Sequence, residues 1–314
     1  MHKNGLSSPM KFPVAFFTDR NMLPGLHVAV LSLLESVSDE TARGLTIKIF
    51  LDQVSDREVD ALHQTVRSSH RGEVEVTYTA YSPTAPKGGS LLHGNHTIYG
   101  RLCLPKLLPS HNHCLYLDSD LIVLCDIGEI FQYFDNKNIL LADGAGVRRF
   151  ALESRLLSRA GLDMEGPYFN SGVLGINLAL WRKRNADDLC AKVLAKFGGD
   201  MTNGDQALLN LALHDSFKSL GETYNTQIFP WSPPVKEPDR RIYHFVGSPK
   251  PWDFLGSWAS SHYTMWHDIY RRTAIGHRSP LCYSSLLRNL RITRQFIRSG
   301  VRRHKLLRAG GKAK

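Results

Sequence analysis

The sequence has few cysteines and no long apolar run, and each absence argues against a class of protein. Its 314 residues include five cysteines, an odd number, and no two of them have C-x-x-C spacing. This argues against a disulfide framework or a cysteine zinc site and favours reduced thiols. No run of about 18 apolar residues is available to span a bilayer, and residues 1–11 lack the apolar core of a signal peptide. We therefore expect a cytoplasmic protein.

Acidic residues are missing from the C-terminal segment 271–314. The whole chain carries 39 Lys and Arg against 29 Asp and Glu, a formal net charge of +10. The segment holds 13 of the basic residues and no acidic residue, which leaves 26 basic and 29 acidic residues, a net of −3, in the rest of the chain. The excess positive charge thus belongs to this segment, and it suits an anionic partner such as a membrane surface or a nucleic acid.

Apolar and basic residues in segment 271–314 follow the spacing of a helix. In a helical projection, five apolar side chains cluster on one side and arginines fall on the adjoining side, whereas Ile292 lies off the apolar side. Such a helix lies in the interface plane of an anionic membrane, so we expect a peripheral protein on the cytoplasmic face. The alternative is that the apolar side packs on the main domain. A nucleic acid fits less well, because the segment has no recognisable nucleic-acid-binding motif. The five apolar residues are Leu286, Leu290, Phe296, Ile297 and Val301.

Strand and helix patterns alternate along the N-terminal part of the chain. Apolar or alternating runs predict strands at 13–17, 45–51, 74–78 and 114–117. Helical spacing predicts a helix over 23–36, and Ser55 with Glu58 three positions later forms the capping signal of a second helix. This order is typical of a parallel sheet with crossover helices.

The rest of the chain is less regular but still divides into elements. We expect a loop over 82–94, a helix over 99–108, a strand over 172–177 and a helix over 205–213. The chain as a whole is predicted to have three parts. These are a flexible N-terminus at 1–12, a single Rossmann-like α/β domain with a mostly parallel sheet at 13–270, and a basic helical extension at 271–314.

Two aspartates, Asp118 and Asp120, follow the predicted strand 114–117. Side chains two positions apart in an extended chain point the same way, so two carboxylates can share a hard divalent cation. Such a cation neutralises the phosphates of a nucleotide. Open α/β sheets bind ligands at the carboxyl ends of their strands. The pattern therefore predicts a metal site, with a solvated strand end as the alternative.

Asp19 and Asn21 occupy the loop after the first strand. Their side chains can hydrogen-bond a uracil edge or ribose hydroxyls, and open α/β sheets offer such loops to nucleotides. An ordinary turn with a helix N-cap is the alternative for these two residues.

Residues 243–252 gather an imidazole, a glycine, a lysine and a tryptophan. His244 offers a nitrogen ligand that suits Mn²⁺. Gly247 lets backbone N–H groups approach a phosphate, and Lys250 places a positive charge on it. A surface turn anchored by Trp252 is the alternative.

Amides and carboxylates also stand beside apolar runs in two segments between Asp120 and residue 243. Asn170 lies in the first, and Asp205 and Gln206 lie in the second. Buried polar groups cost free energy unless they are paired, so these side chains are candidates for binding sugar hydroxyls. Each of them is equally compatible with a turn or a helix cap.

Taken in order, the motifs resemble those of the family 8 retaining glycosyltransferases. These include bacterial lipopolysaccharide galactosyl- and glucosyltransferases, with glycogenin as a distant relative. The resemblance covers residues 13–268, and six motifs in the same order are far more specific than any one of them. They are T-D-x-N, Y-x-R-L, L-Y-L-D-S-D, F-N-S-G-V, D-Q-x-L-L-N and H-F-x-G-x-x-K-P-W.

The resemblance implies a nucleotide-sugar-binding domain of the GT-A type with a metal and a UDP-sugar donor. It implies that Asp118, Asp120 and His244 bind Mn²⁺, with Mg²⁺ as an alternative metal. It also implies a catalytic set made of Gln206, Asp205 and Lys250.

The resemblance further implies a set of donor-binding residues. Arg20 departs from the family pattern, which has an acidic or small residue there, and the spacing around Asp143 is ambiguous. The implied set is Asp19 and Asn21 at the uridine, Gly247 and Lys250 at the diphosphate, Arg101 near the sugar and phosphates, Ser119 within the D-S-D motif, Asn170 in the sugar pocket and Asp143 on the acceptor side.

The expected reaction transfers glucose or galactose from UDP-glucose or UDP-galactose to a hydroxyl of a glycan or glycolipid, such as a lipopolysaccharide. The motifs contain no clear carboxylate nucleophile, and Gln206 is a poor one, so we expect front-face attack by the acceptor hydroxyl. One alternative is a membrane- or nucleic-acid-binding protein that acts through its tail and has an inactive nucleotide-sugar-like domain. Another is a nucleotidyltransferase.

Overall fold

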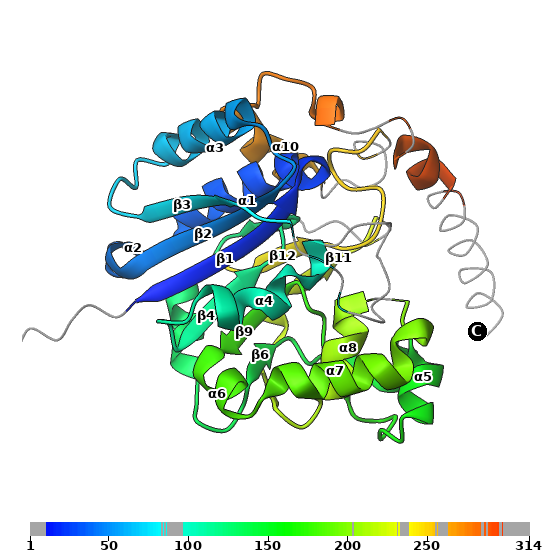
Figure 1. The fold of residues 1–314 in the computed structure, drawn as a ribbon. Helices are drawn as coiled ribbons and strands as arrows, with labels where there is room; N and C mark the ends of the chain where they lie inside the picture. The colour runs from blue at the N-terminus through cyan, green and yellow to red at the C-terminus, as the bar shows by residue number, and fades with distance from the viewer. Residues whose placement is uncertain are drawn as a thin grey trace, which may run out of the picture.

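The computed structural model describes residues 11–82, 84, 86, 97–202, 204–230, 232, 239–254, 256, 263–283, 286, 288–294 and 297, drawn in colour in Figure 1. Most of the predicted N-terminus 1–12, most of the predicted loop 82–94, and Phe296 and Val301 of the predicted tail helix lie outside the described residues. The three-part division of the chain stays a prediction.

A seven-stranded sheet with the order β10-β6-β9-β4-β1-β2-β3 forms the centre of the molecule. The strands β1 to β4 run parallel, as do β6 and β10, whereas β9 is antiparallel to both of its neighbours. The bounds are β1 Phe12–Asp19, β2 Leu45–Asp52, β3 Glu75–Ala80, β4 His113–Leu117, β6 Leu140–Ala142, β9 Val173–Asn177 and β10 Phe217–Ser219.

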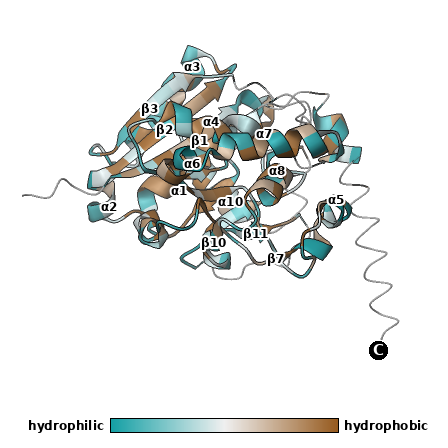
Figure 2. Cartoon of the chain, turned by 60° about the horizontal axis from the view of Figure 1, so that its bottom comes forward, coloured by the Kyte–Doolittle hydropathy of each residue, from teal (hydrophilic) through white to brown (hydrophobic). Residues whose placement is uncertain are grey.

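Helices cover both faces of this sheet. Figure 1 shows α1, α3 and α10 on one face and α4, α6, α7 and α8 on the other. In Figure 2, α7 alternates apolar and polar residues, as expected for a helix with one buried side. The bounds are α1 Leu23–Ser36, α2 Asp39–Gly44, α3 Asp56–Ser68, α4 Gly100–Leu107, α5 Ser154–Arg159, α6 Leu178–Lys183, α7 Ala186–Phe197, α8 Gly204–Ala212 and α10 Tyr263–Arg272.

The alternation of side chains along β1 divides the core into two clusters. Val14 and Phe16 belong to the cluster under α1 and α3, whereas Ala15 and Phe17 belong to the cluster under α4 and α7. Successive residues of a strand point to opposite faces, so a run that is apolar throughout can be buried on both. This burial keeps the carboxyl end of β1, with Asp19, at a fixed edge of the sheet.

A small second sheet brings a distant segment to that edge. It consists of β11 (Thr226–Ile228), β12 (Ile242–Phe245) and β5 (Leu121–Val123). β5 begins directly after Asp120 and pairs antiparallel with β12, with His244 opposite Leu121. This pairing places His244 beside the two aspartates. A third sheet consists of two antiparallel strands, β7 (Gly146–Val147) and β8 (Pro167–Tyr168).

The sequence predictions for the N-terminal elements are confirmed. The first three strands pair in parallel, and α1 has the predicted bounds. The Ser55 hydroxyl and the Glu58 carboxylate form a complete capping box at α3. The predicted strand 172–177 is present as β9, and its antiparallel direction was not predicted.

In the C-terminal helix, the buried residue is Ile292, which lies off the predicted apolar side. Residues 288–294 are helical, but Leu286, Leu290 and Ile297 are 76%, 57% and 59% exposed, whereas Ile292 is 5% exposed. On the same helix, the Arg288 guanidinium lies 3.1 Å from the buried Asp253 carboxylate. For these described residues, the packing of the predicted apolar side on the domain is likewise not observed.

No helix among the described residues is both long and apolar enough to cross a membrane.

Candidate active site

A cleft of about 1160 Å³ opens at the carboxyl edge of the central sheet. It brings together nearly all the residues that the sequence singled out. Asp143 is the exception: it is buried, its carboxylate accepts a hydrogen bond from the Ala145 N–H at 3.0 Å, and it is not among the lining residues. The predicted residues that line the cleft are Asp19, Asn21, Arg101, Asp118, Ser119, Asp120, Asn170, Asp205, Gln206, His244, Gly247 and Lys250.

Asp118, Asp120 and His244 form a cluster of potential metal ligands. One ligand atom of each lies within 4.8 Å of the others. His244 Nε2 is 3.3 Å from Asp120 Oδ1 and 3.9 Å from Asp118 Oδ2. Within the described part of the chain, the buried Asp120 Oδ1 has no hydrogen-bond partner. An unsatisfied buried carboxylate oxygen facing an imidazole nitrogen fits a divalent cation, which would bind both atoms.

Lys250 adds a positive charge beside this cluster. Its Nζ lies 2.5 Å from Asp120 Oδ2 and donates to the Phe245 carbonyl oxygen. Burial by itself would raise the pKa of Asp120, but the Lys250 ammonium beside it opposes this effect, and this pKa lies below its ordinary value. Asp120 is therefore ionised and available as a ligand.

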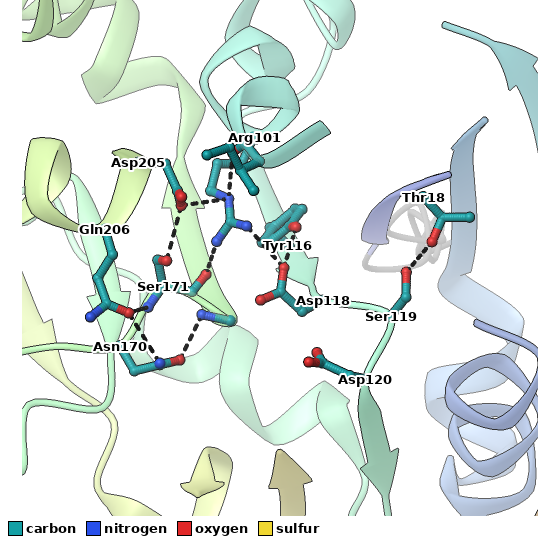
Figure 3. A network of polar contacts seen from close by, with 12 residues as sticks. Thr18, Arg101, Tyr116, Asp118, Ser119, Asp120, Asn170, Ser171, Asp205 and Gln206 are labelled. Carbon is teal, nitrogen blue, oxygen red and sulfur yellow. Dashed lines mark hydrogen bonds and ion pairs between the residues drawn. The ribbon is translucent and has the colours of Figure 1, made fainter. Parts of the chain in front are cut away.

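Arg101 organises the carboxylates on the other side of the cluster. Its side chain is 4% exposed, its Nη2 lies 2.9 Å from Asp118 Oδ1, and its Nε lies 3.1 Å from Asp205 Oδ2. The guanidinium also stacks 4.3 Å above the Tyr116 ring, and the Tyr116 hydroxyl donates to Asp118 Oδ1 at 2.5 Å. Figure 3 shows this network, in which one cation orients two acidic side chains.

Amide and hydroxyl groups form a second network next to Arg101. Asn170 Nδ2 donates to Gln206 Oε1 at 3.1 Å, and the Ser171 hydroxyl donates to Asp205 Oδ2 at 3.0 Å (Figure 3). Asp205 and Gln206 stand in the first turn of α8, so their side chains are fixed by a regular element. Burial raises the pKa of Asp205, and Arg101 opposes this effect.

In the loop after β1, Asp19 is both the cap of a 3₁₀ turn and a residue that lines the cleft. Asp19 caps the 3₁₀ turn Arg20–Met22 through a 3.0 Å bond from the Met22 N–H, and it also lines the cleft with Asn21. The Asn21 carbonyl oxygen accepts from the indole N–H of the buried Trp252 at 3.0 Å, which ties this loop to the 243–252 segment. Arg20 pairs with Glu58 at 2.9 Å.

Two glycines explain how the backbone fits around the site. Gly247 has φ +80°, a conformation that favours glycine, and it lines the cleft. At Gly172, an added Cβ would lie 2.2 Å from His244 Cε1 and 2.7 Å from His244 Nδ1. Glycine at 172 therefore leaves the space that the imidazole occupies.

Four residues that contact the site were not predicted from the sequence: Tyr116, Ser171, Gly172 and Asn225. Asn225 is 1% exposed and contacts both His244 and Asn170 through its amide. It follows the 3₁₀ turn Glu222–Tyr224 directly and stands among other polar residues, so no local pattern marked it. The first three lie inside motifs that the sequence analysis quoted, but their contacts depend on the tertiary fold.

Known proteins resemble this chain in sequence and in fold. The glycosyltransferase GlyE of Streptococcus pneumoniae is 30% identical over 175 residues, which cover 52% of this chain and 39% of GlyE. The chain thus spans well under half of GlyE. The lipopolysaccharide 1,3-galactosyltransferase of Salmonella typhimurium is 24% identical over 262 residues, which cover 81% of this chain and 76% of that enzyme.

The fold is also shared with a solved structure. The galactosyltransferase LgtC, solved in complex with donor and acceptor sugar analogues, superposes with a TM-score of 0.67 at 20% identity and covers 82% of this chain and 95% of LgtC. At this identity the likeness shows the fold, a mixed α/β domain of the GT-A type. The sequence model of Glycosyl transferase family 8 matches residues 13–256, most of the chain, and shows that the protein belongs to this family of glycosyltransferases.

Proposed function

We propose that the protein is a retaining glycosyltransferase that transfers glucose or galactose from a UDP-sugar to a hydroxyl of a glycan or glycolipid acceptor, such as a lipopolysaccharide. The observation that carries this proposal is the position of Asp118, Asp120 and His244 beside Lys250 in one cleft. Mn²⁺ or Mg²⁺ held by these three ligands would supply positive charge to the diphosphate of the donor.

In this proposal, each of the other cleft residues binds one part of the donor. Asp19 and Asn21 hold the uridine at the carboxyl end of β1. Gly247 and Lys250 bind the diphosphate, where the backbone at Gly247 permits a close approach. Asn170 and Gln206 bind sugar hydroxyls through their amides.

Asp205 is a poor candidate for the nucleophile of a double displacement. Its Oδ2 already accepts the Ser171 hydroxyl and pairs with Arg101. We therefore favour attack by the acceptor hydroxyl on the same face from which UDP leaves. The bond from the anomeric carbon to the β-phosphate oxygen breaks, the bond to the acceptor oxygen forms, and the acceptor proton passes to the departing phosphate. Lys250 stabilises the charge that develops there.

The test is a donor hydrolysis screen in which UDP-glucose and UDP-galactose are incubated with the protein and Mn²⁺. We expect release of UDP from one donor, with an Asp120→Asn variant as the inactive control. NMR of the first-formed product should show retention of the anomeric configuration. Cleavage that releases UMP would indicate a different nucleotide chemistry, and a trapped sugar–enzyme adduct in mass spectra would contradict the front-face mechanism.

We also propose that segment 271–314 holds the enzyme on the cytoplasmic face of an anionic membrane, where a lipid-linked acceptor would lie. The exposure of Leu286, Leu290 and Ile297 supports this, because these apolar side chains are available to a lipid surface. Two further exposed residues, Phe150 and Leu152, line the cleft together with Arg288. Figure 1 places α5, which follows Leu152 in the chain, and the C-terminal helix on the same side of the molecule.

Co-sedimentation with anionic and neutral vesicles tests the membrane proposal. The full chain should bind anionic vesicles, and the double variant Leu286→Ser/Leu290→Ser should bind them less. Leu189→Ser is a matched control, because Leu189 is also exposed, at 38%, but lies on α7. Equal binding to both vesicle types would contradict the membrane proposal and leave the enzymatic one untouched.

A further inference from the structure

A chain of hydrogen bonds leads from the backbone N–H of Gly172, which can only donate, to the metal ligand His244. The backbone N–H of Gly172 donates to one side-chain oxygen of Asn170, at 2.8 Å. A backbone N–H can only donate, so the Asn170 atom that it contacts must be the amide oxygen Oδ1. The other end of this amide is fixed in the same way, because Asn170 Nδ2 donates to Gln206 Oε1, which also accepts from the Ser171 backbone N–H at 3.3 Å.

The orientation of Asn170 determines that of Asn225. The side chain of Asn225 contacts Asn170 Oδ1 at 3.0 Å, and because that oxygen can only accept, Asn225 must present its NH₂ group there. The Asn225 oxygen Oδ1 then faces His244 Nδ1 at 2.9 Å. An amide oxygen cannot donate, so Nδ1 of the imidazole must carry the hydrogen. In a neutral imidazole, the lone pair is then on Nε2, the atom that faces Asp120.

We propose that Asn225 is a positioning residue that holds His244 in the Nδ1–H tautomer and thereby directs the Nε2 lone pair to the divalent cation. The inference rests on the proposed function of the same site. It also connects the metal ligand His244 to the sugar-pocket amide of Asn170 through one side chain.

Burial and packing make this arrangement rigid. Asn225 is 1% exposed and the side chain of His244 is 4% exposed, so bulk water does not compete for these bonds. Asn225 directly precedes β11, which pairs with β12 so that Gln227 lies opposite His244. From another side, the ring of His244 contacts Gly172, where a Cβ would collide with it.

Two substitutions separate the functions of the Asn225 amide. Asn225→Ala removes the acceptor for the Nδ1 hydrogen, and loss of such a partner typically weakens metal binding about 10–100-fold. Asn225→Asp keeps an acceptor for the Nδ1 hydrogen but places a carboxylate oxygen opposite Asn170 Oδ1. We expect this variant to keep its Mn²⁺ affinity and to show a raised KM for the UDP-sugar. Asn112→Ala, at an exposed position, is the matched control.

The primary readout is the Kd for Mn²⁺ alone, measured from the free-Mn²⁺ signal in electron paramagnetic resonance and independent of turnover. A ¹⁵N NMR spectrum of histidine-labelled, metal-free wild type should also show a hydrogen on Nδ1 of His244, in the Nδ1–H tautomer or in the imidazolium, and this test requires no variant to fold. An Nε2–H tautomer, or an unchanged Mn²⁺ Kd in a folded Asn225→Ala variant, would overturn the proposal while UDP-sugar hydrolysis by the wild type still supports the enzyme. Absence of Mn²⁺ binding by the wild type would overturn the metal site as well.

Discussion

Replacing Asp120 by Asn tests the centre of the proposed site with a minimal change in shape. The side chain is 7% exposed, and it lies 2.5 Å from Lys250 Nζ and 3.3 Å from His244 Nε2. The amide has the size of the carboxylate but no charge, so it neither binds the cation strongly nor pairs with the Lys250 ammonium. Removing one partner of a buried charge pair costs about 3–5 kcal/mol. If this loss is expressed in the transition state, the rate falls by about two to four orders of magnitude.

The assay for Asp120→Asn is kcat/KM for UDP-sugar hydrolysis over a range of Mn²⁺ concentrations, with a thermal melt to show that the fold persists. His244→Ala should have a smaller effect on the dependence on metal concentration, because two carboxylates remain. Asp188→Asn is a suitable control, since Asp188 is exposed on α7 and is not among the residues that line the cleft. Near-normal rates of Asp120→Asn in excess Mn²⁺ would refute its assignment as a metal ligand.

Three further predictions concern Lys250, Gly172 and His27. Lys250→Ala should cost about 2–3 kcal/mol of transition-state stabilisation, seen mainly in kcat; an effect confined to KM would make Lys250 a uniform binding contact. Gly172→Ala should displace the His244 ring and raise the Mn²⁺ Kd, since the new Cβ would lie 2.2 Å from Cε1; unchanged metal binding would contradict this packing. Burial lowers the pKa of His27 to about 3, so the unfolded chain takes up the proton first as pH falls. The free energy of unfolding should therefore drop by about 1.4 kcal/mol per pH unit below about pH 6.5, and urea titrations should show that His27→Leu lacks this term.

Local patterns in the sequence were sufficient for much of the fold. The apolar run before Asp19 predicts a strand buried on both faces, and the Ser55 and Glu58 pair predicts the start of α3, because both signals depend on residues that are neighbours in the chain. The direction of β9 could not be predicted in this way. Its residues are apolar on both faces whichever way the strand runs, and pairing with β4 and β6 decides the direction.

The tail shows the limit of a helical projection. The projection identified the residues that share a side, but it could not identify which side meets the domain. In the structure, Arg288 pairs with the buried Asp253 and Ile292 is buried, while Leu286 and Leu290 stay exposed. The partner carboxylate belongs to a segment distant in sequence, so no pattern within the tail contains this information.

The chemical groups of the site can be identified from the amino-acid sequence alone, together with the short segments that carry them. They are two carboxylates after a strand, an imidazole and a lysine in a later segment, and amides beside apolar runs. These features follow from local propensity and spacing. Only the tertiary structure decided that Lys250 meets Asp120 across 130 positions of the chain, and that Asn225 stands behind His244. The physical reason is that hydrogen bonds and ion pairs depend on distances in space, and strand pairing such as that of β5 with β12 sets those distances.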